Sequence, residues 1–313
     1  MTAQILGLHH VTATVDDAQS DLDFGIDALG LRLVKKTVNF DSPGVYHFYY
    51  GDERGTPGTI WTTFPYKPRG IRHGTQGSGQ VTVTSFSVPE GSLDRWKTRL
   101  RERSFTVTDG PPRFGEESII VTDPSGLAIE LVATKRDTRA PWLTEGLDDA
   151  SAVRGIHSVT MTVDDPRPTL AFMHEWLGFS VTEEMEGRTR VSVNGEGPGK
   201  SIDVRVDPEA RRAVNGIGTV HHVAVAIGSE EEQLALREAL LQRGVDVTPV
   251  MDRSYFRSIY FREPGGVLFE VATTAPGFDV DEPVAELGRS LKLPPWEEPK
   301  RAIIEAALPP VRY

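Results

Sequence analysis

The chain has 313 residues, 38% of them hydrophobic and 25% charged, a composition typical of a folded globular protein with about two domains. Its 34 basic and 45 acidic residues give a net charge of −11, the wrong sign for a phosphate-binding surface, so nucleic acid is not expected as a partner. The absence of cysteine excludes disulfides, iron–sulfur clusters and thiolate-bound zinc, and leaves histidine and carboxylate side chains as metal ligands.

The chain has no apolar run of membrane-spanning length. The first eight residues have neither the basic region nor the apolar core of a signal peptide. We therefore expect a cytoplasmic protein that does not bind membranes.

A repeat organises the rest of the sequence. Residues 155–165 align with residues 7–17 at an offset of 148, and residues 258–274 align with residues 118–134 at an offset of 140. The chain therefore contains four related modules, of which the third resembles the first and the fourth resembles the second.

Each module is predicted to be a βαβββ unit, because an alternating strand precedes a capped helix and about three further strands. The expected helices cover residues 17–29, 92–103, 166–177 and 229–242. The expected N-caps are Asp16, Ser92, Asp164 or Asp165, and Ser229.

The modules divide the chain into two halves and an arm. Residues 1–135 hold modules one and two, and residues 153–275 hold modules three and four. Residues 136–152, which are rich in charge, are predicted to be a linker. Residues 276–313 are rich in proline and predict an extended C-terminal arm that wraps the body.

The last module carries the clearest chemical signal. Its first strand contains His221 and His222, and its last two strands flank a Glu-Pro-Gly-Gly turn. A hairpin centred on Pro264 would pair Tyr260 with Leu268 and Ser258 with Glu270. Tyr260 and Glu270 would then project from one face, so a histidine and a carboxylate share a concave surface.

Four βαβββ units in pairs resemble the vicinal oxygen chelate superfamily, which includes glyoxalases, bleomycin-resistance proteins and extradiol dioxygenases. The resemblance implies an α+β fold of four βαβββ modules paired into two open β-cups. It also implies metal ligands from the first and last strands of modules, which here are His10, His222 and Glu270. Two imidazoles and one carboxylate suit Fe(II), with Mn(II) as the alternative.

The repeat also predicts what the other cup lacks. By the same offsets, Ser158 takes the place of His10, Thr82 that of His222 and Glu130 that of Glu270. We therefore expect one metal site per chain. Ligands from modules one and four also require those two modules to share a cup, which leaves modules two and three to form the other.

A second ligand set, with His157 in place of His10, would pair modules three and four. His157 aligns with His9, and a shift of one residue along a strand turns a side chain to the opposite face, which favours His10. By the same reasoning His9 and His221 could fill space on the far face of their strands. His47 could face the cup or belong to the core.

Three stretches resemble the chlorohydroquinone and hydroquinone ring-cleaving dioxygenase branch more closely: residues 7–12, residues 252–266 and the tail segments 293–297 and 306–310. The resemblance implies a ring-cleaving dioxygenase that takes O₂ and a dihydroxylated aromatic substrate. It also implies that His9, His221, Arg253 and Tyr260 surround the metal ligands and assist the reaction without binding the metal. Arg253 and Tyr260 would steady negative charge on oxygen, and His9 or His221 would move a proton.

Two other functions remain open at this stage. One is a redox-inert isomerase or lyase of the glyoxalase type, although the closing strand of module one, residues 58–64, offers no carboxylate ligand. The other is a metal-free binder of aromatic compounds, in which His10, His222 and Glu270 would not converge. The sequence does not rank hydroquinones against catechols, and exposed module edges make a homodimer plausible.

Overall fold

The computed structural model describes residues 4–313 and contains the βαβββ unit four times. Module one comprises β1 (Ile5–Val15), α1 (Ala18–Leu22), η1 (Asp23–Ala28), β2 (Arg32–Asn39), β3 (Ser42–Gly51) and β4 (Ile60–Pro65). Module two comprises β5 (Gln80–Pro89), α2 (Leu93–Glu102), β6 (Val107–Asp109), β7 (Glu117–Thr122) and β8 (Ala128–Thr134). Module three comprises β9 (Gly155–Val163), α3 (Pro166–Leu177), β10 (Ser180–Met185), β11 (Arg188–Ser192) and β12 (Ser201–Val206). Module four comprises β13 (Thr219–Ile227), α4 (Glu230–Gln242), β14 (Met251–Asp252), β15 (Phe256–Arg262) and β16 (Leu268–Pro276).

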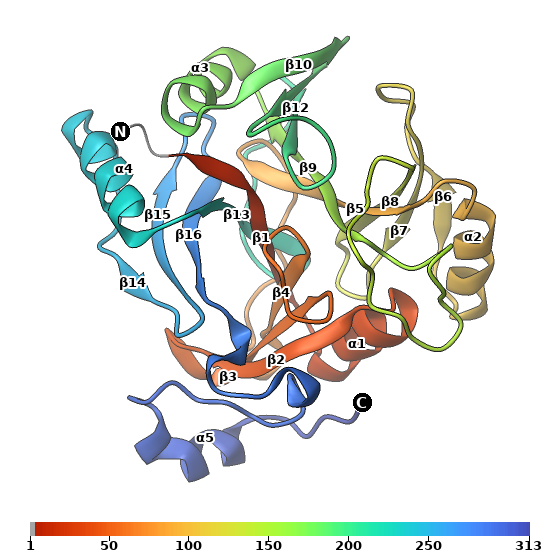
Figure 1. Ribbon diagram of the computed structural model, residues 1–313, viewed down its shortest axis with the longest axis vertical. Coiled ribbons are helices and arrows are strands. Elements are labelled where there is room, and N and C mark those ends of the chain that lie inside the picture. The colour runs from red at the N-terminus through yellow and green to blue at the C-terminus, as the bar shows by residue number, and fades with distance from the viewer. Residues whose placement is uncertain (1–3) are drawn as a thin grey trace.

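The strands form two eight-stranded mixed sheets (Figure 1). One has the order β14-β15-β16-β13-β1-β4-β3-β2 and therefore joins modules four and one. The other has the order β10-β11-β12-β9-β5-β8-β7-β6 and joins modules three and two. We call these sheets the first cup and the second cup. The predicted α+β fold of paired modules is confirmed, and the modules pair as the placement of the ligands requires.

The helices begin close to the predicted positions. Asp17, not Asp16, caps α1, and its side chain accepts hydrogen bonds from two backbone N–H groups of the first turn. Asp165 caps α3 and Ser229 caps α4 in the same way, whereas the Ser92 side chain makes no such bond to α2. Within residues 4–313, no helix is long and apolar enough to span a membrane.

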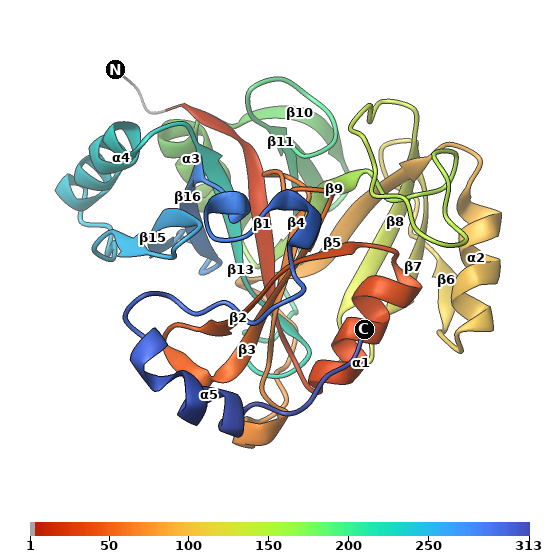
Figure 2. The same cartoon turned by 60° about the horizontal axis from the view of Figure 1, so that its bottom comes forward.

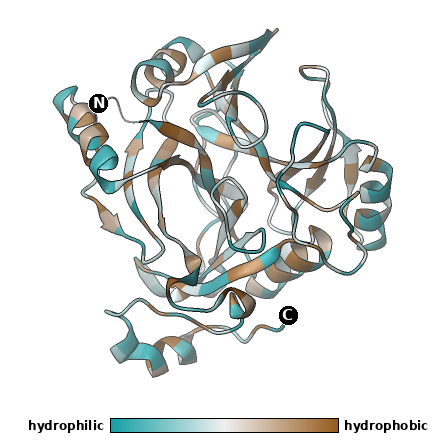
Figure 3. Cartoon of the chain, viewed as in Figure 1, coloured by the Kyte–Doolittle hydropathy of each residue, from teal (hydrophilic) through white to brown (hydrophobic). Residues whose placement is uncertain are grey.

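The hydrophobic core runs through both cups. Strand residues bury alternate side chains under the helices, whose outward faces are largely hydrophilic (Figure 3). Trp61 of the first cup contacts Phe24 of η1 at a ring-centroid distance of 6.1 Å and Phe86 of the second cup at 6.5 Å. Each such apolar side chain stabilises the fold by about 1.5–3 kcal/mol when fully buried. The two sheets therefore share one interior.

The C-terminal arm lies along β2 and β3 of the first cup (Figure 2). It consists of irregular segments, short 3-10 turns and the helix α5 (Arg301–Ala307). The backbone N–H of Lys292 donates to the carbonyl of Lys36, and the buried ammonium group of Lys35 lies 2.6 Å from carboxylate oxygens of both Asp281 and Glu282. The arm is thus fixed to the outer strands of this sheet by hydrogen bonds and a buried ion pair.

Candidate metal centre

Three side chains from neighbouring strands converge in the first cup: His10 of β1, His222 of β13 and Glu270 of β16. Oε2 of Glu270 lies 2.8 Å from Nε2 of His222 and 3.2 Å from Nε2 of His10. The two imidazole nitrogens lie 3.2 Å apart, and all three side chains are buried. The structure brings together the three residues that the sequence predicts as ligands.

Two β-bulges place a second histidine beside each of these imidazoles. In the pairing of β1 with β13, His9 and His221 have no partner opposite them. Nδ1 of His9 lies 2.9 Å from Nδ1 of His10, and Nδ1 of His221 lies 2.8 Å from Nδ1 of His222. Strand alternation alone would put His9 and His221 on the far face of their strands, but a bulge inserts an extra residue and breaks the alternation. His221 lines the cavity, whereas His9 is buried beside His10 and outside the lining.

The hairpin of β15 and β16 positions Glu270. Tyr260 pairs directly with Glu270, so the predicted register is wrong by two residues. The cause is a longer loop, in which the Glu263 carboxylate accepts hydrogen bonds from the backbone N–H groups of Gly265 and Val267. Because a shift of two residues keeps every side chain on its face, Tyr260 and Glu270 still project together as expected.

Arg253 and Tyr260 form the polar wall beside the ligands. Nε of Arg253 donates to the phenol oxygen of Tyr260 at 3.1 Å, and its Nη1 lies 3.2 Å from a carboxylate oxygen of Asp41 on the β2–β3 turn. Burial, together with the nearby Glu270, raises the pKa of Tyr260, which therefore stays a phenol and a donor at neutral pH. Burial opposes the charge of Arg253, but Tyr260 and Asp41 outweigh it and raise the pKa of the guanidinium.

The ligands line a cavity of about 490 Å³. Six aromatic rings form much of its wall, and polar groups lie among them. The lining residues are His10, Thr12, Asn39, Phe40, Asp41, His47, Tyr49, Phe64, Tyr66, His221, His222, Thr248, Met251, Arg253, Phe256, Tyr260, Leu268 and Glu270. His47, for which the sequence leaves two alternatives, faces this cavity.

The sequence missed two parts of the cavity. Phe256 is 3% exposed but lines the cavity and contacts the rings of His9 and His10 at centroid distances of 5.0 and 5.2 Å. Asp41 was not singled out at all, because a turn carboxylate carries no periodic signal. The repeat at an offset of 140 residues could have located the turn that carries Arg253. It could not have located Asp41, the partner of Arg253 in module one.

His9 and His221 are held in the neutral form. Burial lowers the pKa of His9 to about 3, and the neighbouring His10 acts in the same direction. Burial and the neighbouring His222 likewise lower the pKa of His221 to about 3. Burial opposes ionisation of Glu270, but His10 and His222 outweigh it and hold the pKa of the carboxyl well below its usual range. An anionic carboxylate therefore faces two imidazoles.

The second cup has no imidazole at the equivalent positions. Ser158 lies where His10 does, as predicted. The strands β5 and β13, however, align at an offset of 139 rather than 140, since Gly79 and Gly218 directly precede these strands with the same φ of +82°. Val83 therefore takes the place of His222, and the assignment of that place to Thr82 is wrong.

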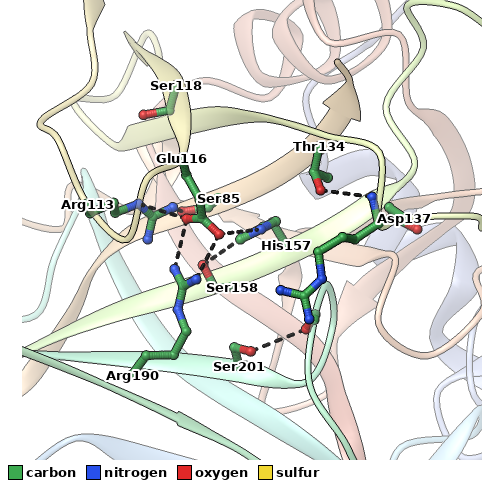
Figure 4. Close-up of polar contacts among 12 residues, drawn as sticks. Ser85, Arg113, Glu116, Ser118, Thr134, Asp137, His157, Ser158, Arg190 and Ser201 are labelled. Carbon is green, nitrogen blue, oxygen red and sulfur yellow. Dashed lines mark hydrogen bonds and ion pairs between the residues drawn. The ribbon is translucent and has the colours of Figure 1, made fainter. Parts of the chain in front are cut away.

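Charged side chains fill the second cup instead (Figure 4). Nη2 of Arg113 donates to Glu130 at 2.7 Å, and Nη1 of the same guanidinium donates to Asp203. Arg190 binds both oxygens of Glu116 at 2.7 and 2.9 Å. Only about 20 Å³ of free volume remains beside this network.

His157 belongs to that network. Its Nε2 lies 3.3 Å from Oε1 of Glu116, and its Nδ1 lies 3.0 Å from Oγ of Ser158 (Figure 4). Because β9 belongs to the second cup, His157 does not join His222 and Glu270. The ligand set that includes His157 is therefore wrong.

The closing strand of module one supplies no fourth ligand. Thr62 of β4 pairs with Thr12 of β1 in the way that Glu270 pairs with Ala224 of β13, so Thr62 takes the position where a second carboxylate would stand. A glyoxalase-type site would need a carboxylate ligand from this strand, and residues 58–64 offer none. A metal-free binder is also disfavoured, since that alternative required the three ligand candidates to lie apart.

Comparisons with known proteins identify the family of the chain. Residues 7–131 and 155–271 match the family described as the glyoxalase/bleomycin resistance protein/dioxygenase superfamily. MhqE of Bacillus subtilis, named as a ring-cleaving dioxygenase, is 43% identical over 97% of this chain and 98% of its own. The chlorohydroquinone/hydroquinone 1,2-dioxygenase of Sphingobium indicum is 35% identical over 94% of this chain and 93% of its own.

Solved structures agree as well. The crystal structure of a Bacillus subtilis protein described as a dioxygenase superposes with a TM-score of 0.94 at 40% identity, covering 99% of both chains. Glyoxalase I from Zea mays shares the fold, with a TM-score of 0.63 at 15% identity over 87% of this chain and 93% of its own. The resemblance predicted from the sequence is confirmed: this chain belongs to the glyoxalase/bleomycin resistance protein/dioxygenase superfamily.

Proposed function

We propose that this chain is a ring-cleaving dioxygenase in which His10, His222 and Glu270 hold Fe(II), with Mn(II) as the alternative ion. One observation carries the proposal: two imidazoles and a carboxylate converge on one side of an aromatic-lined cavity. This donor set leaves coordination positions open, as non-haem iron oxygenases require. The names of the relatives support the reaction class.

The chemistry of the three residues fits a cation. Oε2 of Glu270 is buried and accepts no hydrogen bond from the residues that the structure describes. When Nδ1 of His10 and of His222 carries the proton and donates to the adjacent histidine, each Nε2 presents a lone pair toward Glu270. Two lone pairs and an anion within 3.2 Å of one another repel unless a positive ion lies between them.

A bound Fe(II) would place a substrate oxygen beside O₂ and conduct electrons between them. The remaining work falls to side chains of the cavity. Arg253 and Tyr260 together present a cation and a phenol donor toward negative charge that develops on oxygen. His221 lines the cavity as a neutral imidazole whose Nδ1 accepts the proton of His222, so its Nε2–H can donate to a substrate oxygen. His9 packs against His10 and Phe256 and orients the His10 ring.

The shape and lining of the cavity suit a flat phenolic substrate. The rings of Tyr49, Phe64 and Phe256 form apolar walls, and hydroxyl, imidazole and guanidinium groups among them supply hydrogen-bond partners. The relative from Sphingobium indicum is named for chlorohydroquinone and hydroquinone. We therefore infer that the substrate is a hydroquinone-like dihydroxylated ring.

The test is anaerobic reconstitution with Fe(II), followed by addition of O₂ with hydroquinone, chlorohydroquinone or catechol. Stoichiometric O₂ uptake and a ring-opened product detected by mass spectrometry are expected. Protein loaded with Zn²⁺ is the matched control, since zinc does not change its oxidation state. Equal turnover with Zn²⁺, or none with any of the three substrates, would contradict the proposal.

A further inference from the structure

A hollow lined by three arginines lies outside the candidate metal centre. Its volume is about 360 Å³, and no acidic side chain lines it. The lining residues are Arg72, Gly79, Arg212, Ala213, Val214, Asn215, Arg262 and Gly266. A guanidinium group stays charged at every physiological pH. Because the chain as a whole carries a net charge of −11, three guanidinium groups around one hollow are a local excess of positive charge.

The loop between β15 and β16 holds two of these guanidinium groups. Nη1 of Arg262 donates to the carbonyl of Gly266 at 2.8 Å, and Nη1 of Arg212 donates to the carbonyl of Gly265 at 3.2 Å. Gly266 has a φ of +96°, and a Cβ there would lie 1.9 Å from Nη2 of Arg212, so only glycine leaves room for this side chain. Each guanidinium has five N–H donors, and these bonds to the loop use one of them. The other donors can bind an anion.

The hollow adjoins the cavity that holds the proposed ligands. Arg262 is the last residue of β15 and pairs directly with Leu268, the first residue of β16, which lines that cavity. Paired residues of antiparallel strands project from the same face of the sheet. Tyr260, which also lines the cavity, lies two residues before Arg262 and projects from this face as well. At about 3.4 Å per residue, Arg262 begins roughly 7 Å beyond Tyr260 along the strand.

The proposed reaction turns a neutral substrate into an anion. A hydroquinone is uncharged at neutral pH, because a phenol ionises at about pH 10. Insertion of both atoms of O₂ breaks one C–C bond of the ring, and no other oxidant is consumed. The hydroxyl-bearing carbon of that bond becomes a carboxylic acid, and its neighbour becomes an aldehyde. The acid ionises at about pH 4, so the product at neutral pH is a carboxylate, and one proton is released.

We propose that Arg72, Arg212 and Arg262 form a subsite that binds the carboxylate of the ring-opened product beside the cavity. The inference rests on the proposed function, because ring cleavage creates this carboxylate. A guanidinium pairs with a carboxylate through two parallel charge-assisted hydrogen bonds. A neutral hydroquinone forms no such pair, so the subsite distinguishes the product from the substrate by charge.

The first experiment measures binding of a stable carboxylate. It compares wild type with Arg262→Met, which keeps an unbranched side chain and removes the charge. Arg101→Met is the matched control, because Arg101 is an exposed arginine of α2 in the second cup. Isothermal titration of cis,cis-muconate, a six-carbon dicarboxylate, into the Zn²⁺-loaded protein should show about 10-fold weaker binding in Arg262→Met and unchanged binding in Arg101→Met. Added salt should weaken binding to wild type.

The second experiment separates the product from the substrate during turnover. Steady-state O₂ uptake by the Fe(II)-loaded protein measures KM for hydroquinone and the inhibition constant of the purified ring-opened product. In Arg262→Met the inhibition constant should rise about 10-fold, whereas KM should change less than about 2-fold, because the substrate carries no charge. A general distortion of the cavity would change both constants together.

Two outcomes of the titration would overturn the inference. One is equal muconate binding in wild type and Arg262→Met, and the other is an equal loss in Arg101→Met, which would reflect net charge alone. If Arg262→Met does not fold, Arg72→Met replaces an exposed side chain of the same hollow and should weaken muconate binding in the same way. Failure of wild type to cleave any ring would contradict the proposed function itself, whereas cleavage with unaltered product inhibition in Arg262→Met would contradict only the subsite.

Discussion

The two cups share a backbone plan and differ in how a buried carboxylate is satisfied. In both, a serine 12 residues earlier donates to the carboxylate: Ser258 to Glu270 and Ser118 to Glu130. The second oxygen of Glu130 accepts a hydrogen bond from Arg113. In the first cup, the second oxygen of Glu270 lies 2.8 Å from the imidazole of His222 and 3.2 Å from that of His10, at the wall of a cavity of about 490 Å³.

The same turn supplies an arginine to both cups. Arg113 and Arg253 are 140 residues apart, and each precedes a residue with left-handed backbone, Phe114 with φ 47° and Ser254 with φ 64°. Arg113 turns inward to the carboxylates, whereas Arg253 bonds to Tyr260 and leaves the cup open. An internal guanidinium can thus occupy the place that we assign to a metal ion, and only the cup without it keeps a cavity.

The largest effect is expected from the two carboxylates. Glu270→Gln removes the anionic ligand, and we expect metal content to fall from near one ion per chain to background, measured by inductively coupled plasma mass spectrometry. Glu130→Gln is the matched control and should keep its metal. Metal loss in Glu130→Gln, with the fold intact by circular dichroism, would show that the second cup also binds an ion.

Replacement of the buried Arg113 should destabilise the second cup without removing the metal ion from the first. Arg113 is 2% exposed and contacts Glu130 and Asp203, so Arg113→Met leaves the buried Glu130 without its cation, while Asp203 keeps Arg188 and Arg190. Loss of one partner of a buried ion pair costs about 3–5 kcal/mol. Urea denaturation should show this loss while metal content stays constant, and the double variant Arg113→Met/Glu130→Gln should be less destabilised than the single one. An unchanged urea midpoint in Arg113→Met would mean that the network is not needed for stability.

The outer faces of the cups differ in a similar way. Asp21 under the first cup is 2% exposed and aligns at offset 148 with Thr169 under the second. Burial raises the pKa of Asp21 to about 7 from an ordinary value of 3.8. The folded state therefore binds this proton more tightly than the unfolded state, so stability from Asp21 is full below pH 4 and is lost as pH rises to about 7.

From pH 5 to pH 8 this loss amounts to about 2–3 kcal/mol, at roughly 1.4 kcal/mol per pH unit. Asp21→Asn should remove that slope from the free energy of unfolding measured by urea titration at each pH. A variant whose pH dependence matches that of wild type would place the slope on other groups.

The smallest effect concerns the bulged histidines. His221→Gln removes the partner of Nδ1 in His222, and loss of such an orienting contact typically weakens metal binding 10- to 100-fold. His157→Gln, which changes the second-cup counterpart of His9, is the control and should leave the metal dissociation constant unchanged. Competition with a metal chelator measures both constants, and equal constants for His221→Gln and wild type would remove His221 from the metal centre.

Much of the fold could be predicted because the modules repeat. The offsets that align His10 with Ser158 and Glu270 with Glu130 depend on hydrophobic alternation and on turn residues, which are local signals. The positions of single side chains depended on bulges and on loop length. The β-bulges at His9 and His221 change which face of the strand these side chains project from, and no local pattern in the sequence reveals a bulge.

The second cup illustrates the same limit. The offset of 140 residues aligns Arg113 with Arg253, so the sequence could predict an arginine at this turn. That the Arg113 side chain points into the cup depends on Asp203, which lies 90 residues away. The carboxylate that holds it comes from another module, and long-range charge pairs of this kind have no spacing rule. His47 was ambiguous for a related reason, because an aromatic-rich strand such as β3 has similar side chains on both faces.

The sheet order also sets a sequence of events during synthesis. The second cup is built from strands β5 to β12 and is complete in the growing chain while β16 has still to be made. Since translation proceeds from the N-terminus, β1 has β4 beside it early but must wait for the last module to supply β13 on its other side and β16 beyond it. A chain released before residue 270 would therefore carry one sealed cup and an unfinished half of the other, and only a nearly full-length chain can assemble all three ligands.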